Sequence, residues 1–153
     1  MIAVAPGLTV VVPIDRRSFD RAREDAMLSD FNPVPTLAVK DLDAARSFYE
    51  GTLGFTRSEG DVPDVVLYSV GSGKVMVYAS SYAGTNKATA VSFQVPADGF
   101  DAEVAALREK GVTFLTFDMP SGSWDDGVLS DGSMKSVWFE DLDGNILNVG
   151  TYA

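Results

Sequence analysis

The chain has 153 residues, of which 46% are hydrophobic, so it suits one folded domain and is too apolar to be disordered. It contains neither cysteine nor histidine, which excludes disulfides, thiol nucleophiles, serine–histidine–aspartate catalysis and histidine metal ligands. The formal net charge of −10 predicts no binding to nucleic acid or to an anionic membrane and favours a neutral or cationic partner, although it can also serve solubility alone.

Residues 1–31 are predicted to be an N-terminal extension ahead of a domain that spans residues 32–153. The apolar run Leu8–Val12 is too short to cross a bilayer, and no basic segment typical of a signal peptide precedes it. We therefore predict a cytoplasmic protein. The charged stretch from Asp15 to Met27 has apolar residues on one side, which predicts a short amphipathic helix that packs on the domain or on a partner.

The first half of the domain, about residues 34–82, has the pattern of a strand, a helix and a hairpin. Residues 35–39 form a short β-rich run, and Asp41 is a suitable N-cap for a helix that Gly54 can close in a left-handed conformation. Two further β-rich runs, residues 65–70 and 74–79, flank a Gly-Ser-Gly turn, which predicts a hairpin.

The second half, about residues 88–151, repeats this order. A strand is predicted at 89–95, a helix capped by Asp98 and ended by Gly111, a strand at 112–117, and a hairpin of residues 134–139 and 145–149. The intervening loop from Asp118 to Ser133 is long, rich in glycine and serine, and contains Trp124. The sequence therefore predicts an α+β fold of two tandem βαβββ modules that form an open, barrel-like mixed sheet.

Two segments carry a resemblance to a known family. LAVKDLDAARSFYEGTLGF (Leu37–Phe55) resembles the opening helix of vicinal-oxygen-chelate proteins, the superfamily of glyoxalases, bleomycin-resistance proteins and extradiol dioxygenases. WFEDLDGNILNV (Trp138–Val149) resembles the aromatic-x-Asp-Pro-Asp-Gly-Asn strand of that family, with Leu142 in place of the usual proline. The resemblance covers roughly residues 34–151 and implies a concave interior that holds a ligand.

The resemblance also implies four positions for metal ligands, which are His or Glu in metal-dependent members. They fall on Val34, on Tyr78 with Met76 as the neighbour of matching parity, on Ala90 and on Asn148. Valine, alanine and methionine are poor ligands for a hard cation. We therefore predict a protein without a metal or cofactor, and without metal-dependent glyoxalase or dioxygenase activity.

The preferred interpretation is a binding protein for a small, cationic or aromatic molecule, similar to bleomycin-resistance proteins. Two alternatives stay open: a metal-independent enzyme of the lyase or isomerase kind, with Tyr78 or a carboxylate as the acid–base group, and a regulatory or vestigial module. A homodimer is expected, because modules of this family commonly pair. The predicted ligand-contacting residues are Tyr78, Asn148, Trp124, Met76, Trp138 and Tyr49.

Overall fold

The computed structural model describes residues 32–60 and 63–151, so the helix predicted between Asp15 and Met27 lies outside the described residues. The described helices and strands all belong to one compact unit, residues 34–153. No helix in the described part is long and apolar enough to cross a membrane.

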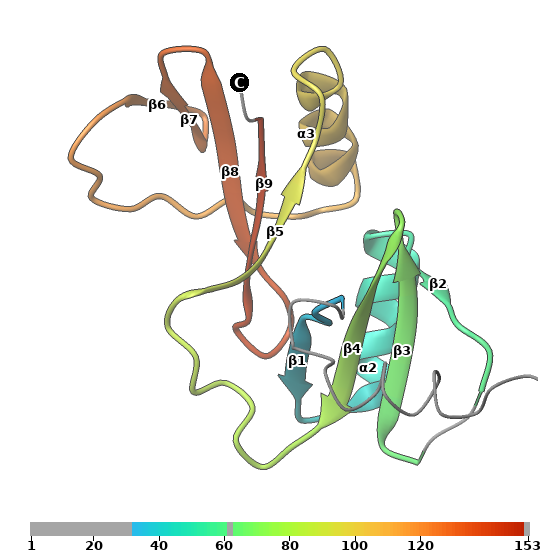
Figure 1. Ribbon diagram of the computed structural model, residues 1–153. Coiled ribbons are helices and arrows are strands. Elements are labelled where there is room, and N and C mark those ends of the chain that lie inside the picture. The colour runs from blue at the N-terminus through green and yellow to red at the C-terminus, as the bar shows by residue number, and fades with distance from the viewer. Residues whose placement is uncertain (1–31, 61–62, 152–153) are drawn as a thin grey trace, which may run out of the picture. The chain divides into compact units, whose positions relative to one another are not determined.

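The first module follows the predicted order (Figure 1). It contains β1 (Thr36–Val39), α2 (Leu42–Arg46), the π-helical turn η2 (Ser47–Thr52), β2 (Thr56–Arg57), β3 (Val65–Val70) and β4 (Gly73–Ala79). Its four strands are arranged in the order β1-β4-β3-β2, with β1 parallel to β4 and the other neighbours antiparallel.

The predicted helix start and end are confirmed in this module. The side chain of Asp41 accepts hydrogen bonds from the amides of Asp43 and Ala44, which satisfies two donors that the first helical turn leaves free. Gly54 has a φ of +71°, a left-handed conformation that is natural for glycine just beyond a helix.

The second module contains β5 (Thr89–Gln94), α3 (Phe100–Glu109), β6 (Ser123–Asp125), β7 (Val128–Asp131), β8 (Met134–Glu140) and β9 (Ile146–Gly150). The five strands are arranged in the order β5-β9-β8-β7-β6, and β5 is parallel to β9. The predicted α+β class and the open sheets are thus confirmed, with one sheet of four strands and one of five in the described residues.

Two local predictions in the second module are wrong. Residues 112–117 form no strand, because only Leu115 pairs, through one bridge to Trp138. The chain is held there by side chains instead: the Arg108 guanidinium lies 5.3 Å from the ring centre of Phe114 and donates to the carbonyl of Asp126. The N-cap of α3 is Gly99 rather than Asp98, and no side chain caps that helix.

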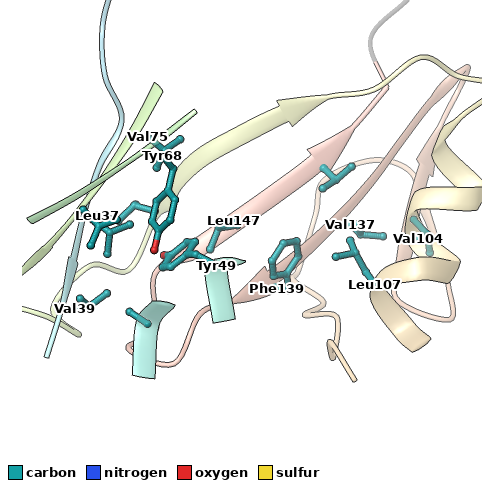
Figure 2. Packing of buried hydrophobic residues seen from close by; sticks show 14 of the residues in the cluster. Leu37, Val39, Tyr49, Tyr68, Val75, Val104, Leu107, Val137, Phe139 and Leu147 are labelled. Carbon is teal, nitrogen blue, oxygen red and sulfur yellow. The ribbon is translucent and has the colours of Figure 1, made fainter. Parts of the chain in front are cut away.

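One hydrophobic cluster contains residues of both modules (Figure 2). Its members include Leu37 and Tyr49 from the first module and Val104, Phe139 and Leu147 from the second. Strand alternation explains this arrangement, because alternate residues of β4 and β8, such as Val75 and Val77 or Val137 and Phe139, point towards the helices and are buried. The residues that alternate with these buried ones point to the face of each sheet that carries no helix.

Candidate functional site

The helix-free face of the second sheet carries a pocket. Trp138 on β8 lies opposite Asn148 on β9, and Asn148 lies beside Ser92 on β5, so these three side chains share one face. A pocket of about 390 Å³ opens over them. This volume is within the range of roughly 300–1,000 Å³ that is typical of small-molecule sites. Its wall also includes Thr89, Met119, Pro120, Ser121, Leu129, Asp131, Met134 and Ser136.

Trp138 lines this pocket, and two further aromatic rings pack against it. The ring centre of Trp138 lies 5.8 Å from that of Phe117 at an interplanar angle of 90°, and 5.9 Å from that of Trp124 at 59°. Trp124 lies on β6 directly opposite Leu129 of β7, and Leu129 is itself part of the pocket wall. These are favourable aromatic geometries, and the electron-rich ring faces attract cations.

Two polar groups accompany the rings. Asn148 is buried and its Nδ2 donates to the carbonyl of Val137 at 3.0 Å, which fixes the amide orientation. Its Oδ1 accepts no hydrogen bond from the described residues, so it is available to a donor in the pocket. Asp131 is exposed at the rim, where it accepts a hydrogen bond of 2.7 Å from the hydroxyl of Ser121.

The other predicted site residues lie elsewhere. Met76 and Tyr78 are half-buried on the helix-free face of the first sheet and do not line this pocket. Val34 is 39% exposed and precedes β1. Ala90 lies where a β-bulge interrupts the pairing of β5 with β9, and it packs against the hydrophobic cluster while Thr89 and Ser92 line the pocket. Val34, Met76, Tyr78 and Ala90 are thus not among the residues that line the pocket of Trp138.

Tyr49 is a core residue that joins the two modules rather than a wall of the pocket. Its side chain has no exposed surface, and its hydroxyl donates to Asp141 Oδ2 at 2.6 Å. Burial first, and then the Asp141 carboxyl group, raise the pKa of Tyr49 well above its usual value. The phenol is thus held in its neutral, hydrogen-bond-donating form.

The Asp141 turn is anchored by several further bonds. Asp141 Oδ1 accepts from the amides of Asp143 and Asn145, at 2.9 and 2.8 Å, and its Oδ2 accepts from Asn145 Nδ2 at 2.7 Å. Asn145 Nδ2 also donates to the carbonyl of Ala38 on β1 at 2.8 Å, and Asp143 accepts from the amide of Lys40 at 3.1 Å. The Asp-Leu-Asp-Gly-Asn turn therefore fastens the second module to the first.

The comparisons with known proteins give the family. The model of the glyoxalase/bleomycin resistance protein/dioxygenase superfamily matches residues 33–149, so the chain belongs to this superfamily. No curated protein matches the sequence significantly.

Three solved structures illustrate the shared fold. An integron cassette protein from the Halifax Harbour sewage outfall is 22% identical with a TM-score of 0.58, and the match covers 80% of this chain and 100% of that one. The fosfomycin resistance protein FosX of Listeria monocytogenes, in its monoclinic form, is 16% identical with a TM-score of 0.61 and coverage of 83% and 94%. A lactoylglutathione lyase of Agrobacterium tumefaciens is 16% identical with a TM-score of 0.60 and coverage of 82% and 96%.

Some members of this superfamily hold a divalent metal, and FosX of Listeria monocytogenes has been solved with Mn(II). The described side chains offer no cluster of acidic ligands for such an ion. Residues 32–60 and 63–151 contain no group of three or more Asp or Glu side chains placed to bind a metal. Of the four positions that the resemblance implied, Val34 and Ala90 offer no ligand atom from their side chains.

The sequence analysis missed nine of the eleven residues that line the pocket, among them Ser92, Met119 and Asp131, and it also missed Phe117, which packs against Trp138. Phe117 was assigned to a strand that does not form, and Asp131 to a loop that contains β7. One signal was present in the sequence, because a long Gly- and Ser-rich segment carried Phe117, Met119 and Trp124 within eight positions.

Proposed function

We propose that this chain is a metal-independent binding protein for a small cationic or aromatic molecule, held on the helix-free face of its second sheet. The observation that carries the proposal is that Trp138, which packs against Phe117 and Trp124, shares the wall of one pocket with the carboxylate of Asp131. A cation over the face of an aromatic ring gains about 0.5–2 kcal/mol, depending on its desolvation. A neighbouring carboxylate and a net charge of −10 act in the same direction.

A matched pair of probes tests the proposal. The 4-hydroxyphenyltrimethylammonium ion and 4-tert-butylphenol have nearly the same shape and differ in charge. We expect calorimetric titration to show tighter binding of the cation, and the indole N–H resonances of Trp124 and Trp138 to move during an NMR titration. Equal affinities for the two probes, or unmoved indole resonances, would contradict the proposed site.

Trp124→Ala tests whether the cation binds at this pocket or elsewhere on the surface. Loss of one ring should weaken cation binding by about 2- to 30-fold, which corresponds to 0.5–2 kcal/mol. Tyr82→Ala is the matched control, because Tyr82 is an aromatic residue that is 77% exposed and lies outside the pocket. An equal effect of both substitutions on cation binding would show that the ring cluster does not form the site.

We also infer that the protein forms a symmetric homodimer. β1 is the edge strand of the first sheet and β5 is the edge strand of the second, so the described part has unpaired strand edges in both modules. The half-buried Met76 and Tyr78 add apolar surface on the first sheet. Light scattering at low micromolar concentration should give about twice 16.3 kDa, and a monomer at that concentration would refute the inference.

A further inference from the structure

A second, larger cavity lies on the opposite face of the second sheet. It has a volume of about 740 Å³, and its walls include Phe93 of β5, Phe139 of β8 and Val149 of β9. These three residues share the helix side of the sheet, because Phe93 pairs with Val149, Val149 pairs with Val137, and Phe139 lies two residues beyond Val137. The sheet therefore lies between this cavity and the pocket of Trp138, and Ser92 on the edge strand β5 borders both.

The first module supplies the opposite wall of this cavity. Leu53, Phe55 and Val70 line it, and the turn between β3 and β4 forms part of its rim. The rings of Phe55 and Phe93 lie 5.8 Å apart, centre to centre, so the two modules touch at the edge of the cavity. A molecule bound there would contact both modules at once.

The polar groups at the rim favour a ligand with a positive charge. Ser72, Ser92 and Gln94 are neutral, and Glu103 of α3 is the one ionisable side chain among the residues that line it. The side chain of Glu103 makes no hydrogen bond or ion pair with any other described residue. The nearby cations are engaged elsewhere, since Lys135 pairs with Asp101 at 2.8 Å.

Arg108 of α3 is engaged in the same way, because its Nη2 lies 2.9 Å from Asp126 Oδ2. Among residues 32–60 and 63–151 the Glu103 carboxylate is thus left without a counter-ion, beside a largely apolar cavity in a protein with a net charge of −10. Cavities of this size that combine apolar walls with a few polar groups are typical of small-molecule sites.

We propose that the cavity between the modules is a second binding site, distinct from the pocket of Trp138, for an apolar monocation such as an arylalkyl amine. The aryl or alkyl part occupies the space between Phe55, Phe93 and Leu107, and the ammonium group faces Glu103 at the rim. The proposal does not depend on the proposed function, because the two sites lie on opposite faces of the sheet.

An NMR titration of the full chain with 1-naphthylmethylamine tests the proposal, and 1-naphthylmethanol is the neutral probe of nearly the same shape. We expect the amine to shift the amide resonances of Leu53, Phe93 and Val95 and to leave the two tryptophan indole resonances unchanged. Indole shifts without shifts at these amides would place the amine in the other pocket and overturn the proposal, and so would the absence of binding by both probes.

Substitutions in α3 test the role of the carboxylate. Glu103→Gln should reduce the preference for the amine over the alcohol by about 2- to 5-fold, the range expected for an exposed ion pair. Glu109→Gln is the matched control, because Glu109 lies on the same helix and does not line the cavity. Equal effects of the two substitutions would show that the amine responds only to overall charge and would overturn the assignment of Glu103.

Ser72→Trp tests the location independently of charge. Ser72 is exposed in the turn between β3 and β4 and lines the cavity, so a larger side chain can be accommodated in the fold while it fills the mouth of the cavity. The variant should bind both naphthyl probes at least 10-fold more weakly and should keep its affinity for the trimethylammonium probe. Unchanged affinity for 1-naphthylmethylamine would overturn the location. If the wild type is a dimer that binds neither probe, and Ser72→Trp is a monomer, a second copy occupies the cavity instead.

Discussion

Tyr49→Phe removes one hydroxyl from the polar contact that joins the two modules. The lost bond, from Tyr49 to Asp141 Oδ2, is 2.6 Å long and buried. A hydrogen bond to a charged group contributes about 1.5–3 kcal/mol. Asp141 still accepts hydrogen bonds from two backbone amides and from Asn145 Nδ2, so its buried carboxylate keeps hydrogen-bond partners. We therefore expect Tyr49→Phe to lower the free energy of unfolding by about 1.5–2 kcal/mol, near the lower end of this range.

Urea denaturation followed by circular dichroism measures this loss. The midpoint should fall while the slope stays unchanged, because the substitution alters stability and not the surface exposed on unfolding. Tyr68→Phe is the matched control: it is also a buried tyrosine, but its hydroxyl donates over 3.2 Å to Glu50, which is exposed. Its loss should stay below about 1 kcal/mol.

A double-mutant cycle decides whether the effect belongs to this pair. In the Asp141→Asn background the acceptor is weakened, so Tyr49→Phe should cost about 1 kcal/mol less than in the wild type. A loss below 0.5 kcal/mol in the wild type, or an equal loss in both backgrounds, would refute the reasoning that the hydroxyl acts through Asp141.

Three further predictions follow from the fold. Burial and Asp141 raise the pKa of Tyr49 above its usual value, and burial and Glu50 raise the pKa of Tyr68 to about 12. Above about pH 10 the unfolded chain therefore loses protons that the folded chain keeps. The free energy of unfolding should then fall by up to about 1.4 kcal/mol per pH unit for each group, and Tyr49→Phe should reduce this slope in urea denaturation between pH 10 and 12. If Tyr49→Phe leaves this slope unchanged, the predicted pH dependence is contradicted. Gly150→Ala places a Cβ atom 2.8 Å from Ser136 Oγ and should lower the free energy of unfolding by about 1–3 kcal/mol. Adding Ser136→Ala should restore part of this loss. If it restores none, the clash with Ser136 is not the cause. Elemental analysis after purification without chelator should find less than stoichiometric zinc, nickel, iron or manganese, and one bound ion per chain would overturn the assignment of a metal-independent protein.

Local sequence signals predicted much of the fold. The helix at Leu42 and the hairpin at residues 65–79 depend on an N-cap, a turn glycine and an alternating pattern, all of which act within a few residues. The segment at 112–117 had the β-branched and aromatic composition of a strand and yet makes only one bridge. Whether a β-rich segment pairs depends on what lies beside it, and here β7 occupies the edge of β8 instead.

The candidate site was predicted only in part, for the same reason. Trp138 and Asn148 share the pocket face because of the β8–β9 register, which the local turn determines. Ala90 was expected on that face, but a bulge against β9 turns it towards the core, and a bulge depends on pairing between strands far apart in sequence. Tyr49 was assigned to the pocket because its partner Asp141, 92 residues away, could not be identified before the modules were seen together.

Three residues of the two motifs that carry the family resemblance serve the architecture of this chain. Tyr49 in the first motif and Asn145 in the second both bind Asp141, and this network holds the hairpin of the second module against β1 of the first. Trp138 and Asn148 of the second motif line the pocket instead, and the two aromatic side chains that pack against Trp138, Phe117 and Trp124, come from the segment between α3 and β7, outside both motifs. A substitution at Tyr49, Asp141 or Asn145 should therefore change stability first, whereas a substitution at Phe117 or Trp124 should change ligand preference while the fold persists.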